Sequence, residues 1–385
     1  MKLLMIVGSG DSVFVYNITK WLKSQMNITI DIFELEPTNK QTFYNYQYYN
    51  SIHSTKKPTI KNKIVQKVFN LFSPYIKSFQ LKKYLKDKQY DVIHAHWITN
   101  SLVISHFLKK HCSKLFITFW GGEISHQKIF NSNYIYRLYL NKFCNHIDTI
   151  VNSQQATLDI TSNLRNYKGK YHYATLGSST IEYIIELMNK ESKATAKIKL
   201  GMPIDKIVVM IGYSGKTLHQ HIPIIKELQK KSRLKNKIHL FAPMTRDCNP
   251  IYTQKVEHEL IKSGFSYTIL KNKYLTDEEV ARIRLATDII FQFSIFDGFS
   301  RSIIECICAK ALLLYGDWLN YKKRLDEFGF EAISCSSIEN GVTQLEEIAY
   351  QISSYNKTTE KNAKNGGKKL LWSECINDWV NLYQS

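Results

Sequence analysis

Residues 288–318 read DIIFQFSIFDGFSRSIIECICAKALLLYGDW. An apolar run, IIFQF, is followed by a polar turn at Asp297 and Gly298, a helix-like apolar segment and a second apolar run, ALLLY. Strand, turn, helix and strand in this order form a β-α-β unit, and strands this apolar belong to parallel sheets covered on both faces. Glu305 stands inside the apolar helix, where a carboxylate without a partner would cost several kcal/mol. This acid therefore needs a ligand or an ion-pair partner.

The same alternation of apolar strands and amphipathic segments runs through both halves of the chain. The strand-like segments are KLLMIVG, ITIDIFEL, DVIHAHW, KLFITFWG, DTIVNS, KIVVMIGYS, KIHLFAPM, SYTILKN, DIIFQF, ALLLYGDW and EAISCSS. A chain of 385 residues is too long for one ordinary core and suits two domains. We predict an α/β protein in which two Rossmann-like domains, 1–178 and 195–368, face each other across a cleft, with 369–385 as a closing helix.

The composition narrows the class of protein. Lys and Arg total 52 against 33 Asp and Glu, and the formal charge of +19 favours a polyanion: nucleic acid, an anionic membrane or a phosphorylated substrate. The chain contains no recognisable nucleic-acid-binding module, so we expect no nucleic acid partner. The seven cysteines include no CxxC pair, which predicts reduced thiols in a cytoplasmic protein. No apolar run approaches the roughly 18–20 residues of a membrane span, and the amino terminus predicts a first strand rather than a signal peptide.

Ligands of open parallel sheets bind beyond the carboxyl ends of the strands, so the loops that follow the strands are the candidate sites. The loop GYSGKTLHQH offers backbone amides, a hydroxyl, a lysine and imidazoles, which favour a phosphate; the alternative is a solvated turn. The turn at Asp297 offers two carboxylates for sugar hydroxyls and helix amides for a phosphate; alternatively, Asp297 caps the helix and Glu305 pairs with a lysine. The donor-binding candidates of the second half are Gly212, Ser214, Gly215, Lys216, His219, Phe299, Ser300, Arg301 and Ser302.

Three loops of the first half are candidates as well. The first strand ends at two glycines and an acid, which can open a helix toward a ligand or simply cap it. Two later strands end in a histidine and in a Trp-Gly-Gly-Glu turn, where a structural histidine and an ordinary turn remain the alternatives. The candidates on this side are Gly10, Asp11, His96, Trp120, Gly121, Gly122 and Glu123.

Taken together, these segments resemble the nucleotide-sugar glycosyltransferases with two Rossmann-like domains, the GT-B type, and especially the large retaining family 4. The resemblance rests on DVIHAHW, IVNSQQATLDI, YLTDEEVARIRLATDIIFQFS and DGFSRSIIECICAKALLLYGDW. The last segment resembles the family's Glu-x7-Glu motif, with Asp297 in place of the first Glu. Tyr213 stands where the family usually has an Arg, and Trp120 where many members have a His. GYSGKTLHQH and APMTRDCNPIYTQKVEHELIKSG also resemble inverting, lipid-linked aminosugar transferases.

The resemblance implies roles for these residues. Lys216, with Arg301 or a histidine, would neutralise the leaving diphosphate, while Glu305 would hold the ribose and Asp297 the donor sugar. Tyr274 would lie beside the base. The residues of the first half would bind a saccharide or polyprenyl-diphosphate-linked acceptor in cell-surface polysaccharide synthesis. An inverting reaction would need Asp11, His96 or Glu123 as base.

No Asp-x-Asp is present, so we expect no metal and no cofactor, the nucleotide sugar being a substrate. Two other function classes remain open: a nucleic-acid-binding protein and a catalytically silent sugar binder.

The segment 56–88, KKPTIKNKIVQKVFNLFSPYIKSFQLKKYLKDK, interleaves lysines with apolar residues. Such a basic amphipathic segment suits an anionic membrane surface. It would place the protein on the inner face of the cell membrane. The alternative is that its apolar face packs on the first domain while its lysines face water.

Overall fold

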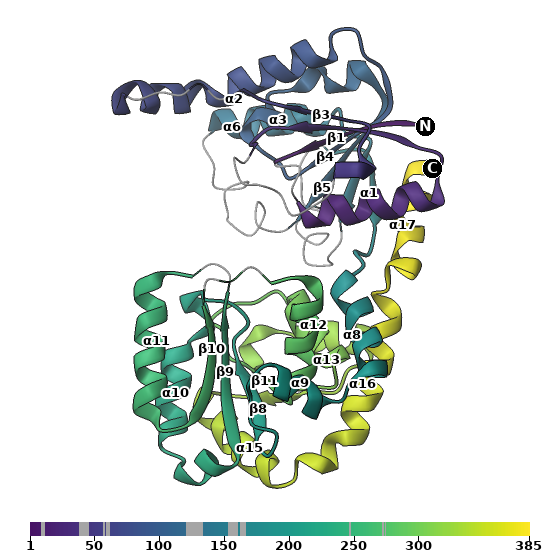
Figure 1. Ribbon diagram of the computed structural model, residues 1–385. Coiled ribbons are helices and arrows are strands. Elements are labelled where there is room, and N and C mark those ends of the chain that lie inside the picture. Colours follow the sequence, from purple (N-terminus) through teal and green to yellow (C-terminus); the bar gives the residue numbers. More distant parts are fainter. Residues whose placement is uncertain are drawn as a thin grey trace. The chain divides into compact units, whose positions relative to one another are not determined.

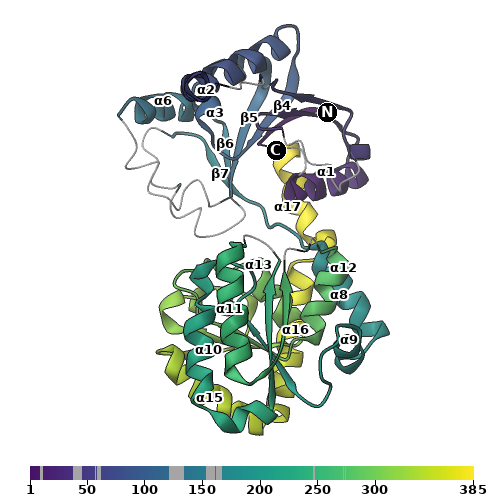
Figure 2. The same ribbon diagram turned by 60° about the vertical axis from the view of Figure 1, so that its left-hand side comes forward.

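The computed structural model describes residues 1–8, 12–37, 46–56, 58, 62–120, 134–152, 161, 167–245, 248–271, 273 and 275–385. The chain forms two compact units (Figures 1 and 2). Unit 1 comprises Met1–Gly177 together with Trp372–Ser385, and unit 2 comprises Ser178–Leu371.

Unit 1 is built on a parallel sheet of seven strands in the order β3-β2-β1-β4-β5-β6-β7. Its strands are β1 (Lys2–Val7), β2 (Thr29–Glu34), β3 (Ser51–Ser54), β4 (Tyr90–His96), β5 (Cys112–Phe119), β6 (Thr149–Asn152) and β7 (Lys170–Tyr173). Its described α-helices are α1 (Val13–Gln25), α2 (Lys63–Leu85), α3 (Asn100–Val103), α6 (Tyr134–Cys144) and α17 (Trp372–Gln384). The strand order 3-2-1-4-5-6 is that of a Rossmann fold, extended here by a seventh strand.

Unit 2 repeats this topology in a parallel sheet of six strands in the order β10-β9-β8-β11-β12-β13. Its strands are β8 (Ile207–Ile211), β9 (Ile238–Met244), β10 (Ser266–Lys271), β11 (Ile289–Gln292), β12 (Leu312–Gly316) and β13 (Ile333–Cys335). Its described α-helices are α8 (Ser179–Lys190), α9 (Lys193–Lys199), α10 (His221–Gln229), α11 (Pro250–Ser263), α12 (Asp277–Ala286), α13 (Arg301–Cys308), α14 (Lys322–Phe328), α15 (Ile338–Tyr350) and α16 (Asn356–Lys369).

Each sheet buries both faces because successive side chains of a strand point to opposite sides. In β8, Val208 and Met210 join a core with α8, α12 and α13, whereas Val209 and Ile211 join a second core with α10, α11 and α15. Figure 1 shows α10 and α11 on one side of the unit 2 sheet and α12 and α13 on the other. The apolar strands of the sequence are therefore apolar because neither face meets water.

The unit boundaries differ from the sequence-based ranges in two places. Segment 179–194, left between the predicted domains, contains α8, whose Ile181 and Ile184 are buried in unit 2. The last helix, α17, closes unit 1: its Trp372 and Trp379 are buried in the core that contains α1. No described helix is both long and apolar enough to cross a bilayer.

Candidate functional site

The candidate site of unit 2 lies where its strand order reverses. β8 and β11 are neighbours in the sheet, although the chain leaves them toward opposite sides. Ligands of this fold bind beyond the carboxyl ends of the strands at such a switch point. The two loops that start there are tied together, since Ile295 N–H donates to Leu218 O (2.9 Å) and Gln220 Nε2 donates to Phe293 O (2.6 Å). The sequence-predicted loops after β8 and β11 therefore form one structure.

The loop after β8 requires its glycines. Gly212 has φ +68°, and a Cβ there would lie 2.8 Å from the Cβ of His219. A Cβ on Gly215 would lie 2.6 Å from Cys248 Sγ. Ser214 is buried in this loop, and Lys216, which follows, is exposed. The loop is thus tightly packed at its glycines, and it exposes the lysine side chain to solvent.

The histidines of this loop are buried, not exposed to a ligand. His219 Nε2 lies 2.9 Å from Ser214 Oγ and its Nδ1 lies 2.7 Å from Ser294 Oγ. Burial, with a smaller contribution from Lys216, lowers the pKa of His219 to about 4. His221 lies 3.2 Å from Tyr252 Oη, and burial followed by the charge of His219 lowers its pKa to about 3. Both imidazoles are neutral at pH 7, so the expectation that a histidine supplies positive charge is wrong; Lys216 and Arg301 remain.

Asp297 accepts hydrogen bonds on both carboxylate oxygens. Tyr321 Oη donates to Oδ1 at 2.6 Å and the Ser300 amide donates to the same oxygen at 3.0 Å. Tyr213 Oη donates to Oδ2. Burial, followed by the charge of Asp297, raises the pKa of both phenols, so each remains a hydrogen-bond donor at neutral pH. The N-cap of α13 is Ser300, so the interpretation of Asp297 as a helix cap is wrong. Its carboxylate accepts from the Ser300 amide in the turn before the helix and is held by two tyrosines in addition.

The backbone after Asp297 is strained at Phe299, which has φ +63° although it carries a bulky side chain. Its buried ring packs edge-on against Tyr321, with centroids 4.9 Å apart. This turn carries the chain into α13, of which Ser300 is the N-cap. Arg301 and Ser302 form the first turn of α13 and are half-buried. Backbone strain of this kind is concentrated at binding and catalytic sites.

Glu305 forms a buried ion pair. Arg284 Nε lies 3.3 Å from Glu305 Oε2, and both side chains are 7% exposed. Ser178 Oγ donates to Glu305 Oε1 at 3.3 Å, and Arg284 Nη2 donates to Ser302 Oγ at 3.0 Å. The apolar helix therefore carries an acid because an arginine of α12 neutralises it, and the expected lysine partner is wrong.

Sequence reasoning missed Arg284 and Tyr321. A signal for Arg284 existed, since it stands in an apolar stretch of α12 beside the buried Ile283 and Leu285. Tyr321 carries no local signal: it follows a short turn after β12, and only the fold brings it to Asp297.

The switch point of unit 1 lies between β1 and β4. His96, at the end of β4, is fully buried, and neither of its ring nitrogens has a hydrogen-bond partner in the described part of the chain. Burial lowers the pKa of His96 to about 3, which makes it a weak base at neutral pH. Its ring stacks on that of His94 at 4.3 Å, and Trp120, half-buried, stacks on Phe14 at 5.0 Å. Gly10, Asp11, Gly121, Gly122, Glu123 and Tyr274 lie outside the described residues.

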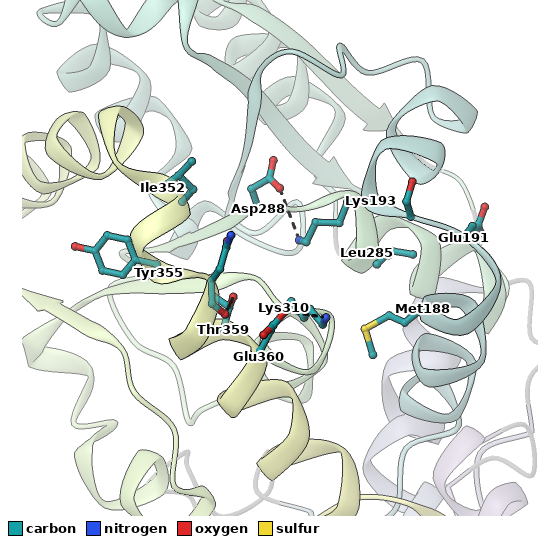
Figure 3. A pocket seen from close by; sticks show the side chains of 12 residues that line it. Met188, Glu191, Lys193, Leu285, Asp288, Lys310, Ile352, Tyr355, Thr359 and Glu360 are labelled. Atoms are coloured by element: carbon teal, nitrogen blue, oxygen red, sulfur yellow. Dashed lines mark hydrogen bonds and ion pairs between the residues drawn. The ribbon is translucent and has the colours of Figure 1, made fainter.

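A pocket of about 330 Å³ lies at the opposite, amino edge of the unit 2 sheet, where Asp288 precedes β11 and Lys310 precedes β12 (Figure 3). Lys193 reaches into it, 3.7 Å from Asp288 Oδ1. None of the candidate site residues lines this pocket. Over the described residues, no group of three or more His, Cys, Asp or Glu side chains is arranged to hold a metal ion.

Comparison with known proteins follows this division into units. Residues 3–155, within unit 1, match the family model described as Glycosyl transferase 4-like. No curated protein sequence matches the chain significantly.

Solved structures match over the whole chain. Sucrose-phosphate synthase from Thermosynechococcus elongatus has a TM-score of 0.74 at 12% identity, covering 100% of this chain and 98% of that chain. A glycosyltransferase from Rickettsia africae has a TM-score of 0.72 at 15% identity, covering 100% and 98%. HepE of Anabaena, solved in complex with UDP and glucose, has a TM-score of 0.71 at 14% identity, covering 100% and 99%.

These likenesses define the class: the chain has the GT-B fold, and its predicted fold class of α/β with two Rossmann-like sheets is confirmed. Within that class, residues 3–155 are similar in sequence to the family described as Glycosyl transferase 4-like.

Proposed function

We propose that the protein is a glycosyltransferase that moves a sugar from a nucleotide-diphosphate sugar to an acceptor with retention of configuration. The observation that carries the proposal is the joined pair of loops at the β8/β11 switch point, with Lys216, Asp297 and Glu305 on them or on the helix that follows. Support comes from the glycosyltransferase 4-like match of unit 1 and from neighbours whose structures hold UDP with glucose or UDP-2-fluoroglucose.

In this proposal, each charged group has one task. Lys216 and Arg301 neutralise the departing diphosphate, and the amides at the start of α13 add the positive end of the helix dipole. Glu305, neutralised by Arg284, holds the ribose hydroxyls. Asp297, fixed by two phenols, accepts from a hydroxyl of the donor sugar.

A retaining transfer of this kind needs no protein base, because the leaving phosphate can take the acceptor proton on the same face of the sugar. The low pKa of His96 agrees with this, since an imidazole with a pKa of about 3 removes a hydroxyl proton poorly at neutral pH. The acceptor would be a saccharide or polyprenyl-diphosphate-linked sugar of cell-surface polysaccharide synthesis. The reaction would take place in the cytoplasm, at the inner face of the cell membrane, without a metal ion.

A thermal-shift screen with UDP-, GDP-, TDP- and CMP-sugars tests donor binding. A donor at 100 times its dissociation constant adds about 2.7 kcal/mol of stability. One nucleotide class should raise the melting temperature, and the same donor should be turned over to free nucleotide diphosphate in the presence of acceptor.

Glu305→Gln should weaken donor binding by about 10- to 100-fold, the value of a hydrogen bond to a charged group. Glu331→Gln, an exposed acid of the same unit, is the matched control and should leave donor binding unchanged. A protein that is stabilised by no nucleotide sugar is not this transferase, and one that binds a donor but never turns it over is a sugar binder.

A further inference from the structure

Helix α2 (Lys63–Leu85) has two parts with different surroundings. In its second part, Leu81 and Leu85 are buried in the unit 1 core, and Ser78 Oγ lies 2.7 Å from Ser105 Oγ. Lys77 forms an ion pair with Glu36. This part is fixed to the sheet, and in Figure 1 the first turns of α2 project from the rest of unit 1.

The first part of α2, together with Phe79 at the start of the second part, exposes large apolar side chains. Leu71 and Ile64 are each 74% exposed, and Phe79 is 67% exposed. At about 100° of rotation per residue, the exposed apolar residues fall within about 120° of the helix circumference, so they form one continuous stripe. The stripe consists of Ile64, Val65, Val68, Leu71, Phe72, Tyr75 and Phe79. Monomeric proteins rarely leave such a stripe in water, and where they do it marks an interaction surface.

The charge of α2 is entirely positive. The helix contains lysines at 63, 67, 77, 82 and 83 and no acidic residue. All except Lys77 are exposed. On the helix circumference, Lys63 and Lys67 lie beside the apolar stripe. Lys82 and Lys83 lie on the same side of the helix as the stripe, beyond its carboxyl-terminal end. The N-cap of the helix is Asn62, whose side chain accepts from the Ile64 and Val65 amides, so the projecting end is capped.

We propose that the apolar stripe of α2 docks on an anionic lipid bilayer, with its flanking lysines at the headgroups. A bilayer offers both chemistries that this surface lacks, hydrocarbon for the stripe and negative charge for the lysines. A nucleic acid would match only the lysines, and a second copy of this basic chain would bring like charges together. The inference deepens the proposed place of the reaction at a membrane surface and does not depend on the transfer reaction itself.

Flotation of the full chain with lipid vesicles tests the proposal. Vesicles of phosphatidylcholine with 30% phosphatidylglycerol should carry the protein, and pure phosphatidylcholine vesicles should carry much less, because each lysine at an anionic surface is worth about fivefold in binding. The difference should shrink in 0.5 M salt. Equal recovery with both vesicle types overturns the proposal.

Substitutions on exposed positions separate the stripe from the overall charge of +19. Leu71→Ser with Phe72→Ser should lower vesicle binding at least tenfold, whereas Ile261→Ser, a 63% exposed apolar residue of α11, should not. Lys63→Gln with Lys67→Gln should lower binding more than the same charge change at Lys255 and Lys262 of α11. Because all these side chains are exposed, the melting temperature and the donor response should stay as in the wild type.

Three outcomes contradict the docking surface. Binding that is unaffected by the Leu71 and Phe72 substitutions places the contact elsewhere. A dimer in sedimentation that these substitutions dissociate makes the stripe an interface between copies. Duplex DNA can be added at a phosphate concentration equal to that of the anionic lipid. If the DNA displaces the protein from the vesicles, and the variant Leu71→Ser with Phe72→Ser still floats like the wild type, the lysines form a nucleic-acid-binding surface. Loss of donor binding with intact flotation, by contrast, would overturn only the transferase.

Discussion

The ion pair between Arg284 and Glu305 predicts a thermodynamic cycle that separates a structural from a ligand-binding acid. At the 3.3 Å between Nε and Oε2, Coulomb attraction with an effective dielectric constant of 20 is about 5 kcal/mol. Breaking a buried pair by removing one partner costs about 3–5 kcal/mol, mostly because the remaining charge is left without its counterion. Arg284→Met and Glu305→Leu should each destabilise unit 2 by that amount.

The double variant Arg284→Met, Glu305→Leu should be more stable than either single variant, because no buried charge is left unpaired. The donor binding of the double variant should not follow its stability. If Glu305 holds the ribose, the double variant recovers stability but not donor binding, because the acceptor oxygens are gone.

Urea unfolding read by hydrogen-exchange mass spectrometry reports on unit 2 alone, since its peptides can be distinguished from those of unit 1. A loss of about 3 kcal/mol lowers the melting temperature of a domain of this size by about 6–12 °C. Lys361→Met, which breaks the exposed pair with Glu331, is the control and should change nothing measurable. A double variant less stable than both singles would refute the reasoning about burial, and full donor binding by the double variant would refute the ribose role.

Three further predictions follow from the same unit. Since burial lowers the pKa of His219 to about 4, the unfolded chain binds its proton first as the pH falls below 6.5, and this loses about 1.4 kcal/mol by pH 5.5. The pKa of His221 is lowered as well, so His219→Gln should remove part, not all, of the fall of the unit 2 urea midpoint with pH, whereas the exposed His258→Gln should leave that fall unchanged. Tyr321→Phe removes the 2.6 Å bond to Asp297 and should cost about 1.5–3 kcal/mol by urea unfolding, against no change for the exposed Tyr350→Phe. Turnover should persist in EDTA; its loss, restored by a divalent cation, would contradict a metal-free reaction.

The fold was predictable because buried parallel strands are apolar on both faces. All eleven strand-like segments of the sequence contain a strand. The two strands that sequence reasoning missed, β3 and β7, are sheet edges of four residues whose side chains are mostly exposed. An exposed edge strand has no apolar run by which it could be recognised.

The sequence could predict only those features of the candidate site that depend on residues close together in the chain. Loops after strands could be listed from sequence, and two of them, at β8 and β11, are joined in the structure. The partners of their acids are not local: Arg284 lies 21 residues before Glu305, and Tyr321 lies 24 residues after Asp297. The sequence also could not show which side chains are exposed. The histidines of the loop after β8 were interpreted as phosphate ligands, but they are buried, and burial lowers their pKa.

The two departures from the glycosyltransferase resemblance in unit 2, Asp297 and Tyr213, meet in a single contact, the hydrogen bond from the tyrosine hydroxyl to the carboxylate. A shorter acid reaches less far into a site, and a phenol in place of an arginine brings a donor without a charge. Tyr213 and Tyr321 together hold the Asp297 carboxylate in place. The positive charge that the resemblance assigns to this position must then come from Lys216 or Arg301. A donor bound here would have to share an oxygen of Asp297 with a tyrosine, so the preference for a donor sugar should change with these two phenols rather than with Asp297 alone.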